Sequence, residues 1–179
     1  MNSLLDTDKV FLKKITKEAI EAVLFHRGKV FSEVPETLQE KMGAFVTLRT
    51  NKEELRGCIG YTKGVLPLHQ TVREMAVQAA FHDQRFKPAC KDEWDDIDVE
   101  ISVLSSLRKI KSLENIKVGV HGILIEKGFN SGLLLPQVAV ENGWDRAAFV
   151  EYACRKAGLP KDAWKSKEIS IYIFSAEVF

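Results

Sequence analysis

The pattern of apolar and polar residues predicts several β-strands in the first two thirds of the chain. Two extended runs, residues 44–49 and 54–60, are separated by four polar residues, which is typical of a β-hairpin. Residues 98–104 alternate strictly and predict a half-buried strand with Glu100 and Ser102 on its polar face. The apolar face of that strand carries Val99, Ile101 and Val103.

Three more extended segments are expected in the last third of the chain. Residues 119–126 predict a strand and residues 133–135 predict its partner, because residues 127–132 between them have the composition of a turn. Residues 168–174 predict the last strand.

The first helix is expected to run from residue 6 to about Arg27, since apolar residues recur there at helical spacing. Asp6 or Thr7 can cap its first turn, and Gly28 is suited to ending it. The predicted apolar stripe consists of Val10, Phe11, Ile15, Ala19, Ala22 and Val23.

Further helices are expected over residues 68–82, with Pro67 suited to the first turn, and over residues 136–142, where Gly143 ends the helix. A last helix would be capped by Asp145. The helix over residues 68–82 has a small apolar face of Leu68, Val72, Met75, Ala76, Ala79 and Ala80. The last helix would turn Phe149, Tyr152 and Ala153 inward.

Two segments lack a clear periodicity. Residues 29–42, which contain Pro35, predict an irregular connector with a turn of helix at residues 36–41. The acidic segment at residues 92–98, around Trp94, predicts a solvated turn or the start of a short helix. It lacks the spacing and the glycine of a calcium-binding loop.

The order of the predicted elements indicates the fold class. Strands and helices do not alternate regularly, so a doubly wound parallel sheet is not expected. The sequence predicts an α+β fold with mixed, mainly antiparallel sheets and flanking helices. With 179 residues the chain is expected to form one domain that buries a core without disulfides or metals.

Charge and hydropathy narrow the classes of function. The 26 Lys and Arg nearly balance the 25 Asp and Glu, so no overall positive charge attracts nucleic acid. No apolar run approaches the roughly 18 residues of a membrane span, and the first residues do not resemble a signal peptide. We expect a cytoplasmic protein with no membrane interaction and no indicated nucleic-acid site.

The cysteines Cys58, Cys90 and Cys154 are widely spaced and include no CxxC pair. This spacing argues against a disulfide framework and against a zinc ribbon. Free thiols in a reducing compartment are the simpler expectation. No motif indicates a cofactor, and the sequence does not fix the oligomeric state.

The hexapeptide LRGCIG at residues 55–60 is where chemistry is most expected. In a strand, Arg56, Cys58 and Gly60 share one face, and Leu55, Gly57 and Ile59 share the other. Glycines inside a strand often mark the close approach of a ligand or of another backbone. Gly57 and Gly60 would therefore provide an open floor beside the thiol.

Cys58 and Arg56 each have a functional and a structural interpretation. Cys58 is either a nucleophile, whose thiolate a cationic neighbour favours, or a buried and inert cysteine. Arg56 either grips a carboxylate or phosphate or forms an internal ion pair, for example with Asp83 or Glu100.

Asp83 and Arg85 flank one residue just after a predicted helix. They either bind a substrate or pair with each other and fix the loop. Glu100 either faces solvent or points into a cleft, and the solvent-facing position is the more common one in an antiparallel sheet.

His121 is expected on a strand face with Ile123 and Ile125, as a structural histidine or as an acid–base group. A metal site formed by Cys58, His82 and His121 is not expected, because no two of these ligands are closely spaced.

The hexapeptide and five other motifs resemble the AMMECR protein family, known in prokaryotes as AmmeMemoRadiSam system protein A. The other motifs are GAFVTL at residues 43–48, DQRF at 83–86, VGVHGI at 118–123, LLPQV at 134–138 and GWD at 143–145. They follow one another in the family's order, and the similarity covers nearly the whole chain. Gln84 stands where many relatives have proline.

The resemblance implies two lobes, a larger one from both chain ends and a smaller one from the middle. It also implies Memo-like and radical-SAM proteins as partners, because relatives are encoded with them. One hypothesis is an enzyme or enzyme component of a modification pathway, and the other is a non-catalytic module that binds a protein or nucleic acid. Catalytic candidates are Cys58, Arg56 and His121. Substrate-binding candidates are Gly57, Gly60, Asp83, Arg85 and Glu100.

Overall fold

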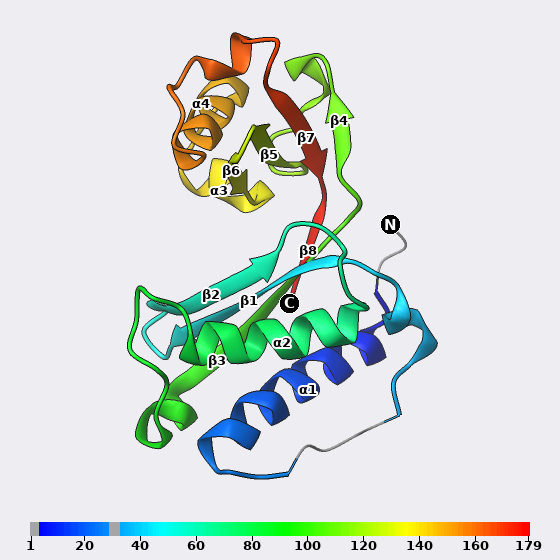
Figure 1. Cartoon of the computed structure of the whole chain (residues 1–179), viewed down its shortest axis with the longest axis vertical. Coiled ribbons are helices and arrows are strands. Elements are labelled where there is room, and N and C mark those ends of the chain that lie inside the picture. Colours follow the sequence, from blue (N-terminus) through cyan, green and yellow to red (C-terminus); the bar gives the residue numbers. More distant parts are fainter. Residues whose placement is uncertain (1–3, 29–32) are drawn as a thin grey trace. The chain divides into compact units, whose positions relative to one another are not determined.

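A computed structural model of the chain describes residues 4–28 and 33–179. The chain divides into two compact units, each with its own sheet and core (Figure 1). Unit 1 consists of Met1–Leu104 and Glu177–Phe179, and unit 2 consists of Ser105–Ala176. The α+β fold class with mainly antiparallel sheets is confirmed.

The sheet of unit 1 has the strand order β2-β1-β3-β8. Its strands are β1 (Gly43–Thr50), β2 (Leu55–Tyr61), β3 (Ile97–Leu104) and β8 (Ala176–Val178). The predicted hairpin of β1 and β2 is confirmed, and β3 pairs antiparallel with the other side of β1. β8 was not predicted, because three residues are too few to show a period.

Helices α1 (Asp6–Leu24) and α2 (Leu68–Phe81) pack against each other and cover one face of this sheet (Figure 1). The predicted inner face of α2 is confirmed, since all six of its residues are buried. Pro67 lies at the N-cap of α2 rather than inside the first turn.

The predicted apolar stripe of α1 is confirmed in part, because Ile15 is buried and Phe11 and Ala19 pack against the core. Val10 and Val23 are exposed, and the buried residues are Asp8, Leu12, Ile15, Thr16, Ile20 and Leu24. The helix has apolar residues on more than one side, and tertiary packing decides which of them are buried. The helix also begins after Leu5, ends before Phe25, and has no side-chain cap from Asp6 or Thr7.

Two polar residues on the buried side of α1 have hydrogen-bond partners. Thr16 Oγ1 donates to the carbonyl of Leu12, and Asp8 Oδ1 accepts from Thr37 Oγ1. Such pairing makes a buried polar group tolerable in a helix face that packs on a core. A hydropathy pattern treats both positions as polar and assigns them to the outside.

The sheet of unit 2 has the strand order β4-β7-β5-β6, with all of its pairs antiparallel. Its strands are β4 (Arg108–Ile110), β5 (Gly122–Lys127), β6 (Asn130–Leu134) and β7 (Ser170–Phe174). Helices α3 (Pro136–Glu141) and α4 (Arg146–Lys156) cover one face of this sheet. The predicted Asp145 cap is confirmed, because its Oδ1 accepts from the amide of Ala148.

Two expectations in unit 2 are wrong. The strand begins at Gly122 rather than at residue 119, so His121 lies before β5 and not on its face. The reversal at Gly119, whose φ is +80°, requires glycine-like backbone and interrupts the predicted run. Tyr152 is not turned inward: it is 39% exposed and stacks on Trp144, with ring centroids 3.9 Å apart.

Short 3₁₀ helices occupy connecting segments, and they are Glu36–Gln39 (η1), Lys91–Asp96 (η2), Leu113–Asn115 (η3) and Ala163–Lys165 (η4). Part of the predicted connector, residues 29–32, lies outside the described residues. The acidic segment forms η2, and its Trp94 is buried, with Nε1 donating to Glu21. Among the described residues, no helix is both long and apolar enough to cross a membrane.

Candidate functional site

The LRGCIG hexapeptide forms most of β2, which is an edge strand of the unit 1 sheet. Alternation places Cys58 on the sheet face opposite to α2 and Gly57 on the face that α2 covers. The predicted assignment of faces is therefore consistent with the structure, because the backbone of Ala79 in α2 lies against Gly57.

Cys58 lies in a row of three polar residues that crosses the sheet. Thr47 of β1 pairs directly with Cys58 of β2 and with Glu100 of β3. Directly paired residues of antiparallel strands project to the same face, so a thiol, a hydroxyl and a carboxylate are neighbours. Thr47 Oγ1 donates a hydrogen bond to Cys58 Sγ at 3.3 Å.

Glu100 is half-buried. Its carboxylate forms no hydrogen bond or ion pair within residues 4–28 and 33–179. Of the three groups in the row, it is therefore the one whose hydrogen-bonding capacity the described chain leaves unused.

Asp83 and Arg85 hold the backbone of Cys58 at the sheet edge. Asp83 Oδ2 accepts from the Cys58 amide at 2.9 Å, and Arg85 Nη2 donates to the Cys58 carbonyl at 3.1 Å. An edge strand exposes unpaired amides and carbonyls, and these two contacts cover both groups of one residue. The thiol-bearing residue is thus fixed from the loop that follows α2.

Asp83 and Arg85 also pair with each other, as one of the two sequence-based interpretations proposed. Arg85 Nη2 and Nε donate to the two oxygens of Asp83 at 2.7 and 2.9 Å. These hydrogen bonds, helped by the Cys58 and Arg85 amides, hold the pKa of the Asp83 carboxyl far below its ordinary value despite its burial. The folded protein therefore favours the ionised form of Asp83.

Arg56 forms an internal ion pair, but not with either residue suggested by the sequence. Its Nε and Nη2 donate to the two oxygens of Glu93, both at 2.8 Å, in a bidentate fork. The fork lowers the pKa of Glu93, and Glu93 Oε1 also accepts from the Cys90 amide. Arg56 Nη1 is buried and has no hydrogen-bond partner in the described part of the chain.

The glycines of the hexapeptide make room for protein rather than leaving an open floor. A Cβ atom on Gly57 would collide with the carbonyl oxygen of Ala79, and one on Gly60 would collide with the ring of Phe45. Both positions therefore allow close packing within unit 1, on the helix face at Gly57 and across the strand at Gly60.

His121 belongs to unit 2, where its ring is held locally. Its Nδ1 accepts from the amide of Lys117 at 3.1 Å. Burial, followed by the nearby charge of Arg108, lowers the pKa of His121 below its ordinary value. These contacts suit a structural histidine that fixes the turn before β5.

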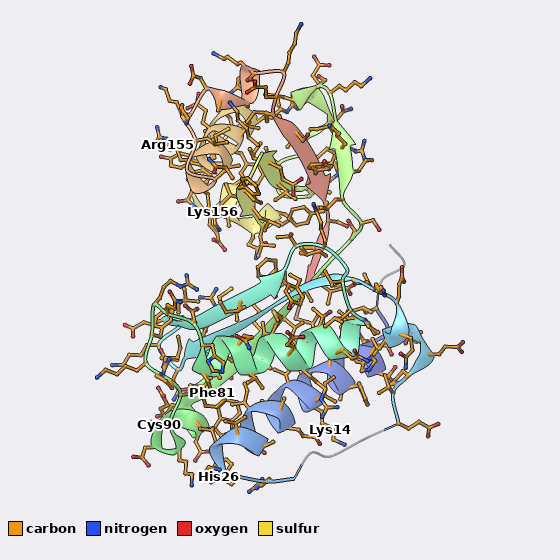
Figure 2. All side chains as sticks on the ribbon, viewed as in Figure 1. Lys14, His26, Phe81, Cys90, Arg155 and Lys156 are labelled. Atoms are coloured by element: carbon orange, nitrogen blue, oxygen red, sulfur yellow. The ribbon has the colours of Figure 1, made fainter. Side chains whose placement is uncertain are left out.

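The other two thiols differ in exposure. Cys90, labelled in Figure 2, is exposed and directly precedes η2, where its sulfur and the Glu93 side chain form a capping box. Cys154 is buried in unit 2, and burial raises its pKa. Within residues 4–28 and 33–179, no three His, Cys, Asp or Glu residues converge as a metal site.

Sequence reasoning missed Thr47 and Glu93. Thr47 could have been found from the hairpin, because pairing 44–49 with 54–60 brings some residue of the first run opposite Cys58. Glu93 gives no such signal, since it lies 37 positions from Arg56 in an irregular segment.

The fold and the edge-strand hexapeptide define a class of α+β proteins with two antiparallel sheets, and comparison with known proteins identifies the family. The AMMECR1 family model matches residues 13–179. The chain belongs to the AMMECR1 family.

Relatives match over most of their length. The protein NEQ441 of Nanoarchaeum equitans is 42% identical over 178 residues, which cover 94% of this chain and 97% of that protein. A protein of Aquifex aeolicus is 49% identical over 156 residues, which cover 82% of this chain and 80% of that protein. The crystal structure of the uncharacterized protein PH0010 from Pyrococcus horikoshii has a TM-score of 0.90 and 39% identity, covering 98% of this chain and 92% of that chain.

Proposed function

We propose that this protein is a cytoplasmic enzyme component of a pathway that modifies a substrate, together with Memo-like and radical-SAM proteins. Its working centre is the row of Cys58, Thr47 and Glu100 on the unit 1 sheet. The family resemblance of the LRGCIG hexapeptide supports the pathway, and the geometry of the row supports the centre.

The observation that carries this proposal is the way in which Cys58 is held. Its amide and carbonyl are fixed by Asp83 and Arg85, and its sulfur accepts a hydrogen bond from Thr47. The hydrogen bond from Thr47 and the fixed backbone limit the positions that the sulfur can take, which favours attack on a substrate held in one geometry. Glu100, with no partner among the described residues, is available to accept a proton or to bind a substrate group.

The proposal gives the other candidates supporting roles. Asp83 and Arg85 position Cys58, and Arg56 joins β2 to η2 through Glu93. Gly57 and Gly60 allow the strand to pack closely. The proposal assigns no step to His121, because that ring is hydrogen-bonded within unit 2.

The test is competitive alkylation with iodoacetamide, read for each cysteine by mass spectrometry. We expect Cys58, although half-buried, to react faster than the exposed Cys90, and Cys154 to react slowest. Replacing Thr47 by Val should slow alkylation of Cys58 and leave Cys90 unchanged. If Cys58 in the native protein reacts no faster than Cys90, a role of Cys58 as a nucleophile is excluded.

A second candidate is a binding module without catalysis. This candidate is favoured because Arg56, Asp83 and Arg85 all form ion pairs within unit 1, so their charges are already balanced by protein groups. In this case the Cys58–Glu100 row is a contact surface for a partner protein.

Pull-down of the Memo-like and radical-SAM proteins separates the two candidates. A binding surface predicts that Glu100→Gln and Cys58→Ser reduce recovery, while Glu114→Gln on an exposed part of unit 2 does not. Equal recovery with all of these baits would speak against docking at this surface.

A further inference from the structure

A pocket of about 550 Å³ lies at the C-terminal end of α2, beside the loop that positions Cys58. It is lined by Gln78, Phe81, His82, Asp83, Gln84 and Phe86. It is a shallow depression that is open to solvent and has a mainly polar lining, so a ligand would contact it on one side. Figure 2 shows Phe81 at this end of the helix.

Two aromatic rings supply apolar surface in the pocket. Phe81 is partly packed against the core of unit 1. The ring of Phe86 lies 5.4 Å from the guanidinium carbon of Arg85 and 6.0 Å from that of Arg56. Both rings are therefore held by protein contacts, and a flat ligand would stack on the part of each ring that these contacts leave open.

Three polar side chains of the lining are uncommitted. The half-buried Gln78 and the exposed His82 and Gln84 form no side-chain hydrogen bond or ion pair with any residue in the described part of the chain. Gln78 and His82 are four positions apart, so they project from the same side of the helix end. Two amides and an imidazole can donate and accept hydrogen bonds at the edge of a planar ring.

The charge of the pocket disfavours an anionic ligand. Asp83, the one carboxylate in the lining, already has its charge matched by Arg85. The C-terminal end of α2 adds a partial negative charge from its carbonyl groups. A phosphate or carboxylate would thus meet no unpaired cation among the lining residues.

We propose that this pocket binds an uncharged planar heteroaromatic group, of the size and hydrogen-bonding pattern of a nucleobase or nicotinamide. The group stacks on Phe86 and Phe81, and its edge is read by Gln78, His82 and Gln84. The site shares Asp83 with the loop that positions Cys58, but ligand binding here needs no reaction at the thiol, so either assignment can fail without the other.

Isothermal titration of the whole protein with adenosine, uridine and nicotinamide tests the site. We expect saturable binding of at least one probe, with Gln84→Ala or Gln78→Ala raising its dissociation constant about fivefold. Gln70→Ala, an exposed position near the start of the same helix, should leave the constant unchanged. Adenosine monophosphate should bind about two- to fivefold more weakly than adenosine if the purine binds.

Phe86→Leu provides a second variant, since it removes the ring and keeps an apolar side chain. It should weaken binding while the thermal melting temperature stays close to that of the wild type. The proposal is overturned if none of the probes binds saturably at millimolar concentration, or if Gln78→Ala, Gln84→Ala and Phe86→Leu all bind like the wild type. Tighter binding of the monophosphate than of adenosine would overturn the assignment of an uncharged ligand.

Discussion

The amide and the carbonyl of Cys58 both form hydrogen bonds with the loop that follows α2, so the position of Cys58 depends on two residues of that loop. Asp83 accepts a hydrogen bond from the amide, and Arg85 donates one to the carbonyl. The sequence offered self-pairing or substrate binding for Asp83 and Arg85, and the structure shows their self-pairing together with a contact to Cys58 that neither interpretation contained. A hydrogen bond between a side chain and the backbone of a distant strand cannot be recognised from the spacing of residues along the sequence.

Replacing Asp83 by Asn should lower the free energy of unfolding at neutral pH by about 1 to 2 kcal/mol. The side chain of Arg85 is 55% exposed, so solvent screens part of the pair. Because the pKa of Asp83 is lowered in the folded state, its stabilisation is complete above the ordinary value of 3.8 and is lost as the pH falls below it. Urea unfolding between pH 7 and pH 2 measures both effects.

In that experiment the difference in the free energy of unfolding between the wild type and Asp83→Asn should stay constant from pH 7 to about pH 5 and become smaller at lower pH. Asp95→Asn, at an exposed position, serves as the control and should follow the wild type. A difference in the free energy of unfolding that grows as the pH falls would contradict the lowered pKa of Asp83.

Replacing Gly57 by Ala should destabilise unit 1 by about 2 kcal/mol or more, because the new methyl group meets the backbone of α2 at Ala79. Gly28→Ala is the matched control, since nothing lies within 4 Å of a Cβ atom there. Denaturant unfolding of both variants gives the comparison. Equal stability of Gly57→Ala and the wild type would show that α2 can move away from β2 at little cost.

At the scale of elements, the ion pair of Arg56 and Glu93 joins strand β2 to helix η2. The side chains are 13% and 31% exposed, and the contact is bidentate. Sequence reasoning recognised that Arg56 would be in an ion pair or a ligand grip but could not name Glu93. The connection between β2 and η2 is made only when α2 and the following loop fold back.

A double-mutant cycle with Arg56→Lys and Glu93→Gln should give a coupling energy of about 1 to 2 kcal/mol, since lysine cannot form the fork. The pair of Lys127 and Glu168, at 2.9 Å on the surface of unit 2, is the matched control and should show no measurable coupling. Similar coupling in both cycles would mean that burial and bidentate geometry do not strengthen the pair of Arg56 and Glu93.

At the scale of the whole molecule, the chain returns to unit 1 for its last three residues. Phe179 exchanges two backbone hydrogen bonds with Ile101, at 2.8 and 3.1 Å. Glu177 accepts from the Leu4 amide and pairs with Lys9. The C-terminus therefore ties β3 to the beginning of α1, although Ser105–Ala176 of unit 2 lies between in the sequence.

Deleting residues 177–179 should accelerate hydrogen exchange in unit 1, first at the amide of Ile101, which loses its acceptor. The amides of β5 should keep their protection, because that strand is paired on both sides within unit 2. Exchange measured by NMR or mass spectrometry distinguishes the units. Equal loss of protection in both would show that they unfold together.

The sequence alone determined the strands with a clear period of two, the hairpin that carries LRGCIG, the small apolar face of α2 and the membership of the family. These depend on residues close together in the chain, whose periodicity and turn chemistry act locally. Only the tertiary structure decided which side of α1 is buried, that β8 completes the first sheet, and that Thr47, Glu93 and the Asp83–Arg85 pair surround the hexapeptide. Such choices depend on contacts between segments tens of residues apart, whose energy exists only once the chain has closed on itself.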